Sequence, residues 1–110
     1  MPNKTATILA VGDMIVDGPD SESLFALAAP VLKSADIVVG QLEIPYTTRV
    51  YPPMQPRDPN ILKVLSVANF NVLTFVGNHT ADLGAPGIED SITWIRDHNI
   101  ALVGAGMNIF

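Results

Sequence analysis

The chain contains no cysteine among its 110 residues. This absence excludes disulfides, thiolate-based zinc sites and thiol nucleophiles, and it suits a reducing cytoplasm. Charged residues are also scarce: they make up 15% of the chain, and Lys and Arg together occupy only six scattered positions. Because phosphate backbones and acidic membrane surfaces are bound by clustered basic residues, we expect no nucleic acid and no membrane among the partners.

Long hydrophobic runs are missing as well. The N-terminal segment has an apolar run of about seven residues, which Gly12 and Asp13 interrupt. Such a run is too short and too polar for a signal peptide or a membrane anchor, so we predict a soluble, cytoplasmic protein. Hydrophobic residues make up 48% of the chain, which argues against disorder and is enough for one small domain.

Strand-like apolar segments alternate with helical patterns along the chain. Residues with helical spacing predict helices at 21–34, at 59–68 and from 86 onward, whereas apolar and β-branched runs predict strands at 5–12, 36–42, 71–76 and 100–103. We expect Pro30 to kink or split the first helix and Asp58 to cap the second. This alternation predicts an α/β fold with a mostly parallel sheet and right-handed crossovers.

A long loop at 45–59 holds five of the nine prolines, together with Tyr46, Arg49 and Arg57. A loop of this length in a compact domain is usually a lid or a binding loop. Its basic and aromatic side chains have two interpretations, which are contact with an anionic substrate and ordinary exposure to solvent.

The chain ends shortly after its last predicted strand, and no helix remains to cover the sheet. Parallel sheets usually have both faces covered. We therefore predict that residues 1–110 are the N-terminal part of a single longer domain. We also expect exposed sheet to make the chain associate with itself or with a missing C-terminal half.

Potential metal ligands follow three of the predicted strands. Asp13 follows the first, Glu43 the second, and Asn78 with His79 the third. In a parallel sheet these strand ends share one edge, so the side chains can converge in one crevice. Two carboxylates and an amide oxygen suit a divalent cation, and the imidazole suits either a metal ligand or a general acid. Taken singly, each residue is equally compatible with an ordinary turn.

The motifs in this order resemble a known family. GDM at 12–14, QLE at 41–43, GNHTADLG at 77–84 and the run at 87–108 are similar to the capsule or poly-γ-glutamate biosynthesis protein CapA family. That family is a branch of the calcineurin-like metallophosphoesterase superfamily. The resemblance covers nearly all of the chain and implies a metallophosphatase-like α/β fold, of which these residues form the N-terminal half.

The resemblance also implies roles for individual residues. It makes Asp13 a ligand of a first metal, Glu43 the bridging carboxylate and Asn78 a ligand of a second metal. His79 is then the catalytic acid, and Asp82 either orients it or caps the loop. The implied cofactors are divalent ions (Mn, Fe, Zn or Mg), two in the full-length protein. The implied reaction is attack of metal-activated water on a phosphoester or amide-like bond of a small-molecule or peptide-like anionic substrate, in a role related to poly-γ-glutamate or capsule.

The chain departs from the family pattern at Gln41 and Gly77, where Asn is usual, and from the wider superfamily at Ile15, where His is common. The superfamily's later histidines are absent, and we expect the remaining one, His98, to interact with the carbonyls at a helix end. We therefore expect half of a two-metal site and no activity from this chain alone. The alternative is a non-catalytic binding or scaffolding module that retains the fold with an incomplete metal site.

Overall fold

Four parallel strands form the sheet of this protein in a computed structural model that describes residues 3–108. The strands are β1 (Ile8–Met14), β2 (Ile37–Leu42), β3 (Val72–Thr74) and β4 (Ala101–Val103), and they lie in the order β1-β2-β3-β4. Every neighbouring pair is parallel. The predicted α/β class with a parallel sheet is confirmed.

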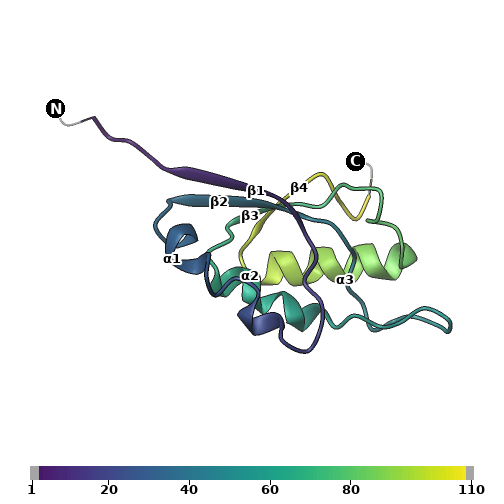
Figure 1. Cartoon of the computed structure of the whole chain (residues 1–110). Helices are drawn as coiled ribbons and strands as arrows, with labels where there is room; N and C mark the ends of the chain where they lie inside the picture. The colour runs from purple at the N-terminus through teal and green to yellow at the C-terminus, as the bar shows by residue number, and fades with distance from the viewer. Residues whose placement is uncertain (1–2, 109–110) are drawn as a thin grey trace.

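The connections between the strands contain short helices and one long one. They are η1 (Ser21–Ser23), α1 (Ala29–Leu32), η2 (Pro59–Leu62), α2 (Lys63–Val67) and α3 (Gly84–Asp97). Figure 1 shows α1, α2 and α3 on the same side of the sheet. Crossovers of one hand between strands that follow each other in sequence produce this one-sided arrangement.

The predicted helix at 21–34 is wrong over most of its length. Only Ala29–Leu32 is α-helical, and turns separate this helix from η1. Pro30 lies in the first turn of α1, where its missing N–H needs no partner, so it begins a helix instead of kinking one. The cap at Asp58 is confirmed, because its Oδ1 accepts the Asn60 N–H at 2.9 Å.

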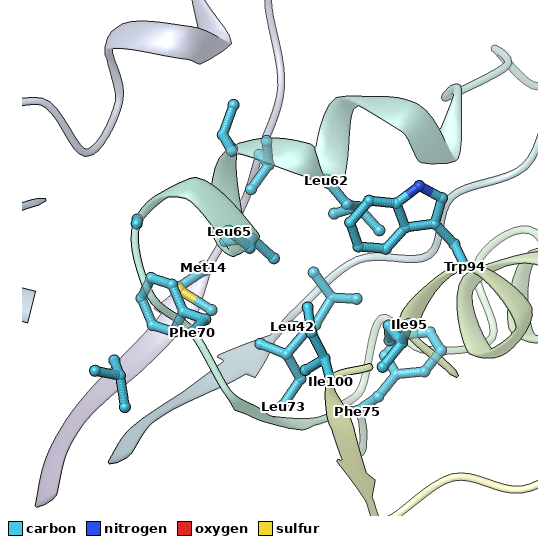
Figure 2. Close-up of a cluster of buried hydrophobic side chains, with 14 of the residues drawn as sticks. Met14, Leu42, Leu62, Leu65, Phe70, Leu73, Phe75, Trp94, Ile95 and Ile100 are labelled. Atoms are coloured by element: carbon cyan, nitrogen blue, oxygen red, sulfur yellow. The ribbon is translucent and has the colours of Figure 1, made fainter. Parts of the chain in front are cut away.

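The hydrophobic core fills the space between the sheet and the helices (Figure 2). Leu42 and Leu73 project from the strands toward Leu62 and Leu65, and all four are fully buried. Trp94 and Ile95 close the core from α3. Within residues 3–108, no helix is long and apolar enough to cross a membrane.

Among the described residues, no helix lies over the other face of the sheet, which is called the helix-free face here (Figure 1). Val38 and Leu42 are buried toward the helices, so the alternate residues of β2 point the other way. The strand pairing then places ten residues on the helix-free face: Ile8, Ala10, Asp13, Ile37, Val39, Gln41, Val72, Thr74, Ala101 and Val103. Most are aliphatic, and Ile8 and Val103 are 62% and 54% exposed. Such a face favours burial against another layer of protein.

We expect the 110-residue chain to self-associate through the helix-free face. Sedimentation velocity should give a mass above 11.7 kDa that rises with concentration. The Ile37→Lys variant should shift the chain toward monomer, because a charge on this face cannot be buried without a large cost. Leu27→Lys is the control, since Leu27 is 98% exposed and lies in the connection between η1 and α1, away from the sheet face. A wild-type chain that stays monomeric at high concentration would contradict this expectation.

Candidate metal centre

Asp13 lies within β1, not in a turn after it. The predicted strand end at Gly12 is wrong, because β1 continues to Met14. The pairing with β2 shifts between Ala10 and Asp13, which is the signature of a β-bulge. After this shift Asp13 lies opposite Gln41, on the helix-free face near the carboxyl edge of the sheet. The bulge therefore determines that the Asp13 carboxylate lies on the helix-free face.

Glu43 follows β2 directly and is nearly buried. Its N–H donates to the Met14 carbonyl at 3.1 Å, and the residue is only 9% exposed. Its carboxylate lies against Gly77: a Cβ added to Gly77 would be 2.9 Å from Glu43 Oε2. Within residues 3–108 the carboxylate has no hydrogen-bond or ion-pair partner. A carboxylate oxygen is the type of ligand that a hard divalent cation binds, so Glu43 is a candidate metal ligand.

The segment after β3 forms a tight series of turns that presents Asn78 and His79. Thr80 organises the turn, because its Oγ1 accepts the Gly77 N–H at 2.8 Å and its own N–H donates back to the Gly77 carbonyl at 3.3 Å. Asn78 and His79 are exposed at the tip of this turn. Thr80 was not singled out from the sequence.

His79 and Asp82 are in direct contact. His79 Nδ1 lies 2.7 Å from Asp82 Oδ2, and both side chains are about half exposed (49% and 45%). When Nδ1 donates to this carboxylate, Nε2 is left free to face a ligand. An Asp82 that orients His79 must contact its ring, and the structure contains this contact.

The structure does not assemble these residues into a complete metal shell. Within the described part of the chain, no group of three or more His, Asp or Glu side chains is placed to hold a metal ion. The structure does place Glu43 against Gly77, the residue before Asn78, and it places Asp13 one strand away. His98 is not part of this site. Its Nδ1 lies 2.7 Å from the Trp94 carbonyl at the end of α3, as predicted.

Tyr46 connects the segments that follow β1 and β2. Its buried hydroxyl donates to the Val16 carbonyl at 2.7 Å and accepts the Val16 N–H at 2.9 Å. Its backbone N–H donates to the buried Ser91 Oγ of α3 at 2.8 Å. Burial is the main cause that raises the pKa of Tyr46 to about 12. Tyr46 therefore sets the relative positions of the chain segments next to Asp13 and Glu43, a role with no local sequence signal.

The loop at 45–59 is tied to α3 by charge. Arg49 Nη2 contacts Glu89 Oε2 at 2.9 Å and Asp90 Oδ1 at 2.8 Å, and the Thr47 hydroxyl donates to Asp90. The Arg49 hydrogen bonds are the main cause that lowers the pKa of Asp90. Because Arg49 is paired and Tyr46 is buried, the structure gives no support to contact between these two residues and an anionic substrate.

Taken together, the fold and the polar edge define an open α/β protein whose candidate site lies beyond the carboxyl ends of its strands. The sequence profile of the family "Bacterial capsule synthesis protein PGA_cap" matches residues 7–109. The chain therefore belongs to this family, and the predicted resemblance is confirmed.

Two curated relatives are longer than the matched region. "Capsule biosynthesis protein CapA" of Bacillus anthracis is 31% identical over 122 residues, which cover 96% of this chain and 30% of that protein. "PGA biosynthesis protein CapA" of Bacillus subtilis (strain 168) is 26% identical over 103 residues, which cover 88% of this chain and 27% of that protein. The chain thus spans less than a third of the length of either relative.

Proposed function

We propose that this chain carries part of the active site of a CapA-type, metal-dependent hydrolase that acts in capsule or poly-γ-glutamate biosynthesis. The names of the two relatives support the biological role. The observation that carries the chemistry is the position of Glu43: the residue is 9% exposed, and its carboxylate has no hydrogen-bond or ion-pair partner among residues 3–108. Its position beside the turn that presents Asn78 is what a cation site at this edge needs.

In this proposal Asp13, Glu43 and Asn78 hold the divalent ions (Mn, Fe, Zn or Mg), with two ions in a complete protein. Bound ions would supply the activation of water for attack on a phosphoester or amide-like bond. The chain's own contribution is an oxygen-rich edge that draws cations to Asp13 and Glu43. We propose an anionic small-molecule or peptide-like substrate, no nucleic-acid or membrane partner, and a cytoplasmic location.

His79 then protonates the leaving group. Its contact with Asp82 at 2.7 Å holds the ring in place for proton transfer to the leaving group. The exposure of both side chains leaves the ring accessible to a substrate from solvent.

A second candidate function is a non-catalytic module that binds or scaffolds other proteins. It is favoured by the observation that the described residues contain no group of three or more His, Asp or Glu placed to hold a metal. The two candidates differ in whether the polar edge binds divalent ions at all.

Titration of the wild-type chain with Mn²⁺, followed by electron paramagnetic resonance and calorimetry, tests the proposal. We expect saturable binding, and we expect Glu43→Gln to weaken it by about tenfold or more because a charged ligand is lost. Glu22→Gln is the matched control, since Glu22 is exposed and pairs with Lys63 Nζ at 3.0 Å on the helical side. Equal affinities of the two variants, or no binding by the wild type, would favour the non-catalytic module.

A further inference from the structure

Gln41 is held in one orientation beside the candidate metal centre. It lies between Asp13 of β1 and Thr74 of β3 in one row across the helix-free face. The Thr74 hydroxyl donates to Gln41 Oε1. Because the carbonyl end of the amide is engaged by Thr74, the NH₂ end faces away from Thr74 and toward Gly77.

Gly77 leaves the space that the Gln41 amide and the Glu43 carboxylate share. A Cβ at this position would lie 2.9 Å from Glu43 Oε2, 3.1 Å from Gln41 Nε2 and 3.4 Å from Glu43 Cδ. The backbone of Gly77 is not in the left-handed region, so alanine is conformationally allowed there. The requirement for glycine therefore comes from the two side-chain ends and not from backbone strain.

The geometry assigns Gln41 and Gly77 as positioning residues for Glu43: the missing side chain of Gly77 leaves room for the carboxylate, and the Gln41 amide shares that room. This inference rests on the proposed function only for the identity of the bound cation. The two positions are also those at which the motifs depart from the usual Asn, and in the structure they lie against each other. The longer Gln side chain reaches the space that a residue other than glycine would fill.

The first test is the Gly77→Ala variant. We expect little change in thermal stability, because the atoms that must move are the ends of flexible side chains. We expect Mn²⁺ affinity to fall by about tenfold or more, as for other changes that displace a metal ligand. Ser66→Ala is the control, since Ser66 is an exposed residue of α2 on the helical side of the sheet. Shortening the neighbour in Gln41→Asn/Gly77→Ala should restore part of the affinity, and this rescue would not follow from a general loss of structure.

A second measurement does not depend on the metal. The ¹³C resonance of the Glu43 side-chain carboxylate in the metal-free chain should shift in Gly77→Ala, return toward wild type in the double variant, and stay unchanged in Ser66→Ala. If Gly77→Ala leaves both this resonance and the Mn²⁺ affinity at wild-type values, the positioning role is wrong. A shifted resonance in a chain that binds no Mn²⁺ would instead support the positioning role and reject the proposed metal site.

Discussion

The Tyr46→Phe substitution is expected to lower the free energy of unfolding by about 2–4 kcal/mol at neutral pH, because two buried backbone groups lose their hydrogen-bond partner. The groups are the N–H and the carbonyl of Val16, a residue that is 1% exposed; both groups bond to the Tyr46 hydroxyl. Urea denaturation monitored by circular dichroism measures this change. Tyr51→Phe is the matched control, since Tyr51 is 81% exposed, and it should change stability by less than about 0.5 kcal/mol.

The same hydroxyl predicts how stability depends on alkaline pH. Burial raises the pKa of Tyr46 from its ordinary value of 10.0 to about 12 in the folded chain. A raised pKa means that the folded state keeps its proton while the unfolded state loses it, so stability is complete below pH 10 and falls between pH 10 and pH 12. Two units correspond to about 3 kcal/mol. Tyr46→Phe should lack this part of the alkaline loss, and Tyr51→Phe should keep it. Identical alkaline profiles for the two variants would show that Tyr46 does not stay protonated in the fold.

The Phe75→Ala variant should have the largest effect on stability, a loss of about 3–5 kcal/mol. Phe75 is fully buried just beyond β3, and it lies in the core near Ile95 of α3 (Figure 2). Because a domain of this kind is stable by only about 5–15 kcal/mol, a large fraction of the variant should be unfolded at moderate temperature. Differential scanning calorimetry measures the shift.

Val76→Ala is the control for Phe75→Ala. It shows whether the lost stability comes from the core or from any truncation near the Gly77 turn. Val76 is adjacent in sequence but 62% exposed, so its truncation should cost less than about 0.5 kcal/mol. Comparable losses from the two variants would mean that the segment after β3 is not held by the core. The turn at Gly77 would then depend on its own hydrogen bonds with Thr80.

Local patterns in the sequence predicted the elements best where a short segment carries a clear signal, such as an apolar run or a helix cap. The apolar run after Asp36 and the Asp58-Pro59 pair specify β2 and the start of η2 without help from the rest of the chain. The segment at 21–34 was mispredicted because helical spacing of Leu24, Leu27 and Val31 does not decide burial. In the structure these three side chains are exposed, so burial of this helical face does not stabilise a continuous helix there.

Part of the proposed site follows from local information in the sequence. That Glu43, Asn78 and His79 follow strands is local information, and so is the spacing that brings His79 and Asp82 into contact. The bulge that moves Asp13 into β1 depends on pairing with β2, which no pattern within β1 reveals. The hydrogen bonds from Tyr46 to Val16 join residues thirty positions apart and are equally invisible.

By itself, the sequence determined the α/β class, the parallel strands and the polar residue types at their ends, because each follows from periodicity and composition within a short segment. Only the tertiary structure decided which face of the sheet stays bare and that Gln41, Glu43 and Gly77 share one small space. Strands of a parallel sheet are apolar on both sides, so their sequences do not say which side the helices cover. That choice comes from the order of the strands and the hand of the crossovers, which are properties of the whole chain.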